Sequence, residues 1–294
     1  MYDISGYMFT KIEPITKGWS KDKKYCVTNA NGVKYLLRIA PSSQYESKKS
    51  LFELQKQVSE LGVPMCIPID FGNCNAGVYT LQSWIYGEDF KDVLLRFTET
   101  EQYLFGIKAG EALRLIHSIT APQDEKNWAT KYNQKIDKQI AMYKDCDIQF
   151  LGDNHILTYL TENRHLLETR QSQCFQHGDY HIGNMMLSEG ELIIIDFDRN
   201  SYGDPWEEFN RIVFCKRSPH FSTGMLRGYF GGEPPKNFFE TLMLYIATNT
   251  ISSIPWAIPF GEADVEFMRQ LTQNVLIWFD NMNNPVPTWY LKDF

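Results

Sequence analysis

The residues best suited to chemistry lie in two short polar segments past the middle of the chain. The first is His177-Gly178-Asp179-Tyr180-His181-Ile182-Gly183-Asn184, and the second is Asp196-Phe197-Asp198, which follows an apolar run at 192–195. An aspartate in a loop can accept the proton of an attacking hydroxyl. The side-chain oxygens of Asn184 and Asp196 are ligands of the kind that Mg²⁺ prefers. The spacing therefore predicts phosphoryl transfer to a hydroxyl group.

These segments resemble the phosphate-transfer motif of the aminoglycoside phosphotransferase and choline kinase superfamily, relatives of the protein kinases. The chain is most similar to the bacterial aminoglycoside phosphotransferases, and the resemblance covers most of its length. It implies that Asp179 is the catalytic base, that His177 orients the loop, and that Asn184 and Asp196 hold Mg²⁺. No Ala-Pro-Glu segment follows Asp196, so the chain does not look like a protein kinase.

The resemblance also implies a phosphate-binding cation on the strand at 34–39. Most aminoglycoside kinases have a lysine there, whereas this chain has Arg38, as choline kinases do. An arginine is permanently charged and can bind two phosphate oxygens at once. Its expected acidic partner on the next helix is Glu53, nine residues before Gly62.

Three further residues are expected to contact the nucleotide. Ser20 lies in the loop at 17–23, where kinases place a glycine-rich phosphate cover, although only one glycine is present here. Gln82 and Trp84 lie in a segment that resembles the hinge between the lobes of a kinase. Backbone recognition leaves no trace in the sequence, so the donor is either ATP or GTP.

Other polar residues near the motif have structural interpretations. Asp204, in a Gly-Asp-Pro turn, should hold its loop through local hydrogen bonds. We interpret Glu208 as structural, with a contact to the substrate as the alternative. His181 either lines the substrate side of the loop or satisfies a backbone group.

The N-terminal part of the chain alternates as expected for strands. Strands are predicted at 25–28 and 33–39, joined by a turn at 29–32, and again at 67–71 and 78–85. Ser43 and Glu46 have the spacing of a capping box. Apolar residues at 51, 54, 58 and 61 then predict a helix that ends at Gly62.

Helical patterns dominate from residue 99 onward. Helices are predicted at 99–118, 129–143 and 155–170, and a short strand at 192–195. We therefore expect an α+β, protein-kinase-like, two-lobe fold. Residues 1–86 would form a small antiparallel-sheet lobe with one helix, which binds the nucleotide and ends in a hinge near 82–86. Residues 87–294 would form a larger helical lobe with the catalytic loop and the acceptor site.

Composition excludes several other classes. The net charge is -7 and no basic block occurs, which gives nucleic-acid binding little support. The six cysteines include no C-x-x-C pair, so a zinc site is not expected. No signal peptide and no apolar run of membrane-spanning length is found. We expect a cytoplasmic monomer that does not bind membranes.

The acceptor is the open question. The C-terminal region is rich in tryptophan and in acidic residues. Acids would suit an aminoglycoside-like, cationic antibiotic, and aromatic rings would suit a quaternary ammonium group. The primary hypothesis is an antibiotic kinase acting on a cationic hydroxylated acceptor. The alternatives are a choline-type or other metabolite kinase, a macrolide kinase, and a pseudokinase that binds nucleotide without catalysis.

Overall fold

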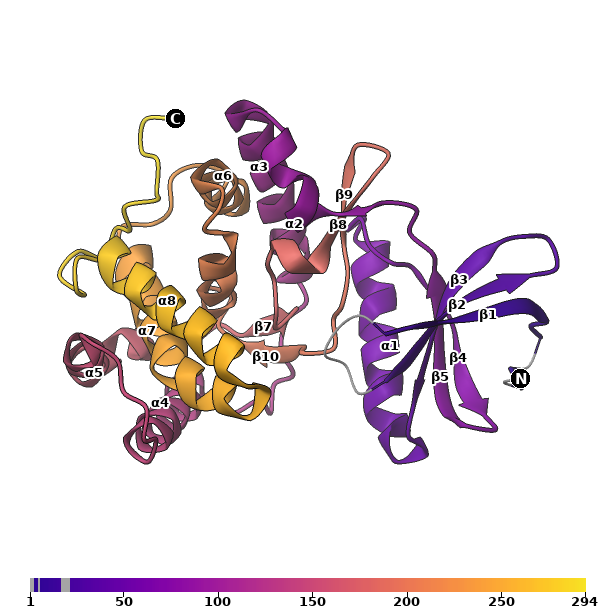
Figure 1. Cartoon of the computed structure of the whole chain (residues 1–294), viewed down its shortest axis with the longest axis horizontal. Coiled ribbons are helices and arrows are strands. Elements are labelled where there is room, and N and C mark those ends of the chain that lie inside the picture. The colour runs from indigo at the N-terminus through magenta and orange to yellow at the C-terminus, as the bar shows by residue number, and fades with distance from the viewer. Residues whose placement is uncertain (1–2, 5, 17–21) are drawn as a thin grey trace. The chain divides into compact units, whose positions relative to one another are not determined.

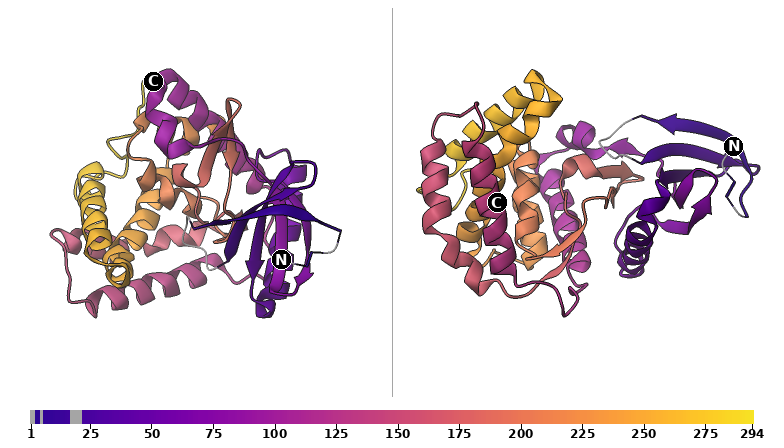
Figure 2. Two further views of the ribbon diagram at one scale, coloured as in Figure 1. Left: turned by 45° about the vertical axis from the view of Figure 1, so that its right-hand side comes forward. Right: turned by 90° about the horizontal axis from the view of Figure 1, so that it is seen from below.

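A computed structural model describes residues 3–4, 6–16 and 22–294. It divides into two compact units, which are considered one at a time (Figure 1, Figure 2). The first unit comprises Met1–Val93 and Gly183–Asn200. The second comprises Leu94–Ile182 and Ser201–Phe294. Ser20 lies outside the described residues.

The first unit is built on a five-stranded antiparallel sheet. Its order is β1-β2-β3-β5-β4, with β1 at Phe9–Ile15, β2 at Lys23–Asn29, β3 at Lys34–Ala40, β4 at Pro68–Cys74 and β5 at Gly77–Ser83. The turn expected after β2 is confirmed. Gly32 has a φ of 79°, and the Asn29 side chain accepts hydrogen bonds from two backbone N–H groups in the turn.

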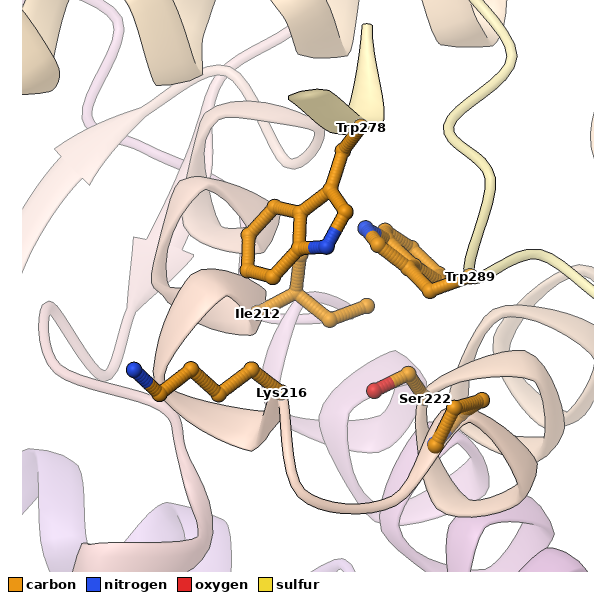
Figure 3. Close-up of a pocket in the computed structure, with 6 residues that line it drawn as sticks. Ile212, Lys216, Ser222, Trp278 and Trp289 are labelled. Atoms are coloured by element: carbon orange, nitrogen blue, oxygen red, sulfur yellow. The ribbon is translucent and has the colours of Figure 1, made fainter. Parts of the chain in front are cut away.

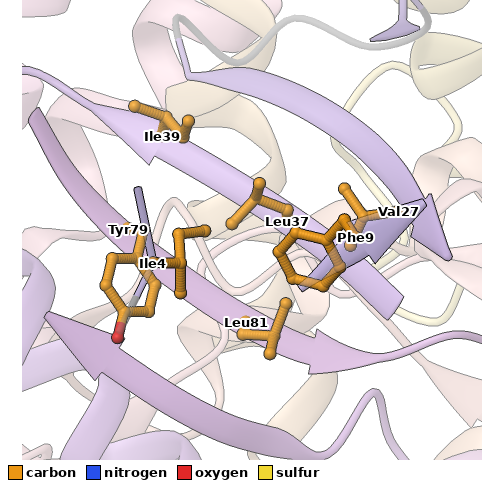
Figure 4. Packing of buried hydrophobic residues seen from close by; sticks show 7 residues of the cluster. All are labelled: Ile4, Phe9, Val27, Leu37, Ile39, Tyr79 and Leu81. Carbon is orange, nitrogen blue, oxygen red and sulfur yellow. The ribbon is translucent and has the colours of Figure 1, made fainter. Parts of the chain in front are cut away.

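Alternation along the strands decides which side chains enter the core of this sheet. Leu37 and Ile39 of β3 pack with Val27 and Leu81 in an apolar cluster on one face (Figure 4). Successive side chains of a strand point to opposite faces, so Arg38 must lie on the other face. That face is covered by α1, whose Phe52 ring lies 5.6 Å from the Phe71 ring of β4.

Helix α1 spans Tyr45–Glu60 and follows the short 3₁₀ helix η1 at Ser42–Gln44. The expected capping box is wrong, because the helix begins only after Gln44 and no side chain caps it. The extra 3₁₀ turn displaces Ser43 from the N-cap position. Helical periodicity then turns Phe52, Gln55 and Val58 inward.

A second, three-stranded sheet completes the first unit. It has the order β6-β8-β9, with β6 at Glu88–Asp89, β8 at Met185–Ser188 and β9 at Glu191–Ile194, and the short helix α2 at Phe90–Val93 follows β6. Ile194 joins this sheet to the preceding chain, since its N–H donates to the Pro64 carbonyl at 2.8 Å. These strand pairings extend the first unit to Val93 and include residues 183–200 in it. The sequence suggested a single boundary near 86.

The second unit is mainly helical. Its α-helices are α3 at Glu99–Ile116, α4 at Trp128–Lys144, α5 at Asp153–Glu162, α6 at Pro219–Phe230, α7 at Phe238–Ala257 and α8 at Glu262–Trp278. Two short strands, β7 at Cys174–Gln176 and β10 at Ser201–Gly203, pair antiparallel. The single helix expected at 155–170 is instead α5 followed by the 3₁₀ helix η3 at Arg164–Thr169, because the backbone leaves the helical region at Asn163.

No helix in the described part of the chain is both long and apolar enough to cross a membrane.

Helices α3 and α6 pack unusually closely because glycines face each other. Gly106 and Gly110 of α3 lie against the backbone of α6, and Gly224 and Gly228 of α6 lie against α3. A Cβ added at Gly110 would lie 2.1 Å from the Met225 carbonyl oxygen. This contact holds α6 to α3, and the residues just before α6 line the candidate site.

We expect Gly110→Ala to destabilise the protein by about 1–3 kcal/mol, because overpacking outweighs the better helix propensity of alanine. Chemical denaturation would measure the change. Lys108→Ala, at an exposed position of the same helix, should change stability by less than about 0.5 kcal/mol. A Gly110→Ala protein as stable as its parent would contradict the close packing.

Candidate active site

The segment after β7 forms a tight loop that presents Asp179. Gly178 has a φ of 84°, a conformation that favours glycine. The Asp179 N–H donates to Nδ1 of His177 at 3.3 Å, and the His177 side chain is completely buried. The Asp179 side chain itself stays about 20% exposed. The loop therefore fixes its backbone inside the protein and leaves its carboxylate accessible.

The buried carboxylate of Glu208 holds this loop through hydrogen bonds. Both oxygens of Glu208 accept the Gly178 N–H at 3.0 Å, and one also accepts the Tyr180 N–H at 3.4 Å. Nε2 of His117 lies 3.7 Å from Glu208 Oε2. Burial raises the pKa of Glu208, but His117, His177 and the Gly178 N–H outweigh it and bring the pKa below its ordinary value. The structural interpretation of Glu208 is confirmed.

Glu208 belongs to η5, the 3₁₀ helix at Glu207–Cys215, which runs alongside the loop. Residues three apart in a 3₁₀ helix share one face. Arg211 places its Nε 3.3 Å from Asp179 Oδ1, and the Phe214 ring lies 5.2 Å from the His181 ring. One face of η5 thus contacts the loop at successive positions. His181 also approaches the carboxylate, with Nε2 3.6 Å from Asp179 Oδ1.

Asp204 connects β10 to the start of η5 and is fully buried. It accepts two hydrogen bonds from Arg170, at 2.8 and 2.7 Å, one from the Trp206 N–H at 3.1 Å, and one from the Tyr245 hydroxyl. Its carbonyl accepts from Gln176, the last residue of β7, at 2.9 Å. The local role expected of Asp204 is confirmed, and the network extends it by tying η5 to the strand that leads into the catalytic loop.

In the first unit, the hairpin β8–β9 brings the two candidate metal ligands to one end. Asn184 directly precedes β8, and its carbonyl accepts the Ile195 N–H at 3.0 Å. Asp196 follows one residue later, with a φ of 66°. Its Oδ1 is buried and has no hydrogen-bond partner among the described residues. A cation, Arg38, approaches this oxygen to 3.6 Å without a hydrogen bond. A buried carboxylate oxygen that accepts no hydrogen bond favours a cation beside it, so this site suits a bound metal ion.

Mg²⁺ commonly binds to one or two protein side chains and takes its other ligands from phosphates and water. Asn184 and Asp196 fit that pattern. Within the described ranges, no cluster of three or more His, Cys, Asp or Glu side chains could hold a metal by itself.

Arg38 lies at the centre of a network of charges on the α1 face of the large sheet. It pairs with Asp22 at 3.4 Å, with Asp196 at 3.6 Å, and with Asp198. Lys48 of α1 closes the network, 2.6 Å from Asp22 and 3.6 Å from Asp198. Two cations and three carboxylates therefore lie together. Bound phosphates could replace the carboxylates as partners of the cations, and a metal ion could replace the cations as a partner of the carboxylates.

A small hollow opens at this network. Its lining residues come from β3, β5, α1 and the polar segments before β2 and after β9, and they are Asp22, Arg38, Lys48, Leu51, Gln55, Thr80, Gln82 and Asp198. Gln82 is buried and donates to Gln55 at 3.3 Å. The predicted nucleotide residues Arg38 and Gln82 thus share one hollow.

Two other predicted residues lie elsewhere in this unit. Glu53 has a side chain that is 53% exposed and pairs with Lys56 at 3.6 Å, so it is not the partner of Arg38. Trp84 is partly buried and follows β5 directly. The sequence analysis did not identify Lys48, which supplies a second cation to the network. The helical period that turns Gln55 inward also turns Lys48 inward, and this pattern was visible in the sequence.

The second unit has a separate pocket between η5, α6 and the C-terminal segment. Trp278 and Trp289 lie next to each other, with Ile212 beside them and with Lys216 and Ser222 across the hollow (Figure 3). Pro219 completes the lining. Two of the tryptophans that the sequence suggested for an acceptor site therefore meet here. No acid lines this pocket.

Together, the strand–loop aspartate, the hairpin end and the charged sheet face are the parts of a kinase-like phosphotransferase. A model of the phosphotransferase enzyme family matches residues 11–239, so the chain belongs to that family. It is a phosphotransferase with an alcohol group as acceptor. No curated protein matches the chain.

Several solved structures share the fold. A choline/ethanolamine kinase family protein from Mesorhizobium loti is 15% identical, with a TM-score of 0.67 and coverage of 96% of this chain and 92% of the other. A thermostable mutant of the aminoglycoside phosphotransferase APH(4)-Ia, in complex with ADP and hygromycin B, is 15% identical, with a TM-score of 0.64 and coverage of 91% and 94%. An amicoumacin kinase is 16% identical, with a TM-score of 0.61 and coverage of 96% and 92%. The expected fold class is confirmed.

Because the pKa of Glu208 is lowered in the folded protein, its contribution to the free energy of unfolding should depend on pH. A carboxyl whose pKa is lower in the folded state stabilises the protein above its unfolded pKa, about 4.3, and loses that contribution as pH falls through the folded value. Glu208→Gln should lower the free energy of unfolding by about 1–3 kcal/mol at pH 7.

The difference between the two proteins should shrink below about pH 4.3. Urea denaturation at pH 7, 5, 4 and 3 would measure it. A difference that stays constant over this range would show that the charge of Glu208 does not hold the loop.

Proposed function

We propose that this chain transfers the γ-phosphate of ATP or GTP to a hydroxyl group of a small molecule, with Mg²⁺ as the metal. The observation that carries the proposal is the partly exposed Asp196 carboxylate at the end of the hairpin beside Asn184, whose buried Oδ1 accepts no hydrogen bond among the described residues. The adjacent cation Arg38 supports phosphate binding at the same place. Related structures that contain ADP, or AMP-PNP with Ca²⁺, support a nucleotide donor.

Each residue then has a defined task. The acceptor oxygen attacks the γ-phosphorus, the bond from that phosphorus to the bridging oxygen breaks, and the nucleoside diphosphate leaves. Asp179 accepts the proton of the attacking hydroxyl, and His177 keeps the loop in place. Arg38 and Lys48 bind the phosphates. Asn184 and Asp196 would hold Mg²⁺, which neutralises charge on the phosphates when bound.

Two of the predicted nucleotide contacts keep a part in the proposal. Gln82 lines the hollow, and Trp84 follows it at the end of β5, where backbone groups could bind the base. Ser20 remains a predicted phosphate contact. Glu53 faces solvent and has no part in the proposal.

The acceptor is less constrained than the reaction. The hygromycin B and amicoumacin complexes of related kinases support a hydroxylated, antibiotic-like molecule. A choline-type or other metabolite kinase and a macrolide kinase have the same catalytic requirements. The presence of Asp179, Asn184 and Asp196 argues against a pseudokinase. The proposal includes a cytoplasmic monomer, in keeping with six free thiols.

The role of Asp179 can be tested by Asp179→Asn, which keeps the size of the side chain and removes the base. We expect kcat for phosphate transfer to fall about 10²- to 10⁴-fold, with nucleotide affinity unchanged. A coupled assay for nucleoside diphosphate and a calorimetric titration would measure the two quantities. Asp147→Asn, at an exposed position, serves as the control. Undiminished turnover would exclude Asp179 as the base.

The role of Asp196 can be tested by Asp196→Ala. We expect at least a tenfold weaker affinity for ATP in the presence of Mg²⁺, since a carboxylate ligand is lost. The same titration in EDTA is the control, and there the variant should bind no more weakly than the parent. Equal affinities with Mg²⁺ would remove Asp196 from the metal site.

A further inference from the structure

In the second unit, the side chain of Arg211 lies next to the carboxylate of Asp179. Arg211 Nε lies 3.3 Å from Asp179 Oδ1, and the Arg211 side chain is 25% exposed. In the described part of the chain, its two terminal nitrogens donate no hydrogen bond, and its ion pair is the one with Asp179. The 3₁₀ period of η5 fixes this position, because Glu208, one turn earlier, is anchored to the Gly178 N–H.

The position of Arg211 constrains the acceptor. A reacting hydroxyl must come within about 2.6–3.2 Å of the base. The atoms of the acceptor next to that hydroxyl therefore come close to the guanidinium group. An ammonium group at this distance would be repelled, whereas a carboxylate or a phosphate could bind the terminal nitrogens through two parallel hydrogen bonds.

The nearby pocket shows the same charge preference. Lys216, one residue after η5, is its charged lining residue, and the remainder is Ile212, Pro219, Ser222 and two tryptophans. Two of the C-terminal acids have cationic partners of their own. Glu233 pairs with Arg227 at 2.6 Å, and Glu266 pairs with Arg269 at 3.4 Å.

We propose that Arg211 binds an anionic group of the acceptor, so that the enzyme phosphorylates a hydroxylated carboxylate or phosphate ester rather than a polyamine. This inference rests on the proposed kinase function and assigns the substrate class of the same site. The anionic group lies only a few bonds from the reacting hydroxyl, because Arg211 and Asp179 are in contact.

The first experiment determines the charge of the acceptor. The protein is incubated with Mg²⁺ and γ-labelled ATP or GTP, together with a small-molecule extract that has been separated into anionic, neutral and cationic fractions. Hygromycin B and gluconate are tested as single compounds. We expect labelled product from the anionic fraction. Labelled product from the neutral or cationic fractions alone would overturn the inference and leave the kinase function intact.

The Asp179→Asn protein is assayed with the same fractions. If no labelled product appears, or if every labelled product also appears with this variant, the proposed function itself is wrong. Phosphatase treatment of the anionic fraction before the assay separates the two sources of charge. Loss of the product identifies a phosphate ester as the acceptor, and retention identifies a carboxylate.

The second experiment tests Arg211 directly, using the acceptor identified and its neutral amide or dephosphorylated analogue. Arg211→Gln should raise KM for the anionic acceptor about 10- to 100-fold, with kcat changed less than about threefold. KM for the neutral analogue should not change. Arg211→Lys keeps the charge and should give an intermediate KM.

Arg217→Gln removes the same charge at an exposed position of the following turn and should match the parent protein. A purely positioning role for Arg211 would lower kcat equally for the anionic and the neutral acceptor and leave both KM values unchanged. That result would falsify the inference. Thermal denaturation of each variant verifies that it is folded.

Discussion

The catalytic loop depends on the buried carboxylate of Glu208. A buried charge is tolerated only when it is paired and hydrogen-bonded, and Glu208 obtains both from backbone N–H groups of the loop and from two imidazoles. The Gly178 conformation and the accessible side of Asp179 follow from that anchor. Because Glu208 lies in the first turn of a 3₁₀ helix, the same contact also fixes Arg211 one turn later. Asp179 therefore has a set geometry before any substrate arrives, which is the form of preorganisation that favours catalysis.

The donor side has a different constraint, namely the alternation of β3. Leu37 and Ile39 enter the core, so Arg38 must face α1 and the polar chain after β9. Burying a guanidinium there requires counter-ions, and three aspartates supply them. Lys48 adds a second cation from α1. We expect phosphate groups to replace some of these acids as partners, which leaves the carboxylates for a metal ion.

Much of this architecture could be predicted from local patterns. Alternation predicted four of the five strands of the first sheet but not β1, the Asn29–Gly32 turn was recognisable, and the spacing of Asp179, Asn184 and Asp196 indicated the reaction. The errors arose where a pattern had two solutions. Gly62 suggested Glu53 as a partner, whereas helical periodicity points Lys48 inward. Contacts between Glu208 and Gly178, and between Arg211 and Asp179, join residues about thirty positions apart through a 3₁₀ helix. No local period in the sequence reveals such contacts.

The reaction and the choice of acceptor depend on different parts of the chain, and the sequence indicates the reaction more clearly than the acceptor. The segment from His177 to Asn184 contains the proposed base and a proposed metal ligand within eight residues of chain, so their spacing can be read from the sequence. Acceptor selection depends on single side chains of η5 and of the segments around α6 and α8, which no shared motif fixes. Structures only 15% identical to this chain share its fold, and they include a choline/ethanolamine kinase family protein and an aminoglycoside phosphotransferase bound to hygromycin B. For this chain, the local charges decide the question. The acidic C-terminal composition suggested a cationic acceptor, but the acids Glu233 and Glu266 have partners of their own, and the Arg211 guanidinium contacts Asp179. Overall composition is therefore a poor guide to the substrate here, and the partner of the catalytic carboxylate is a better one.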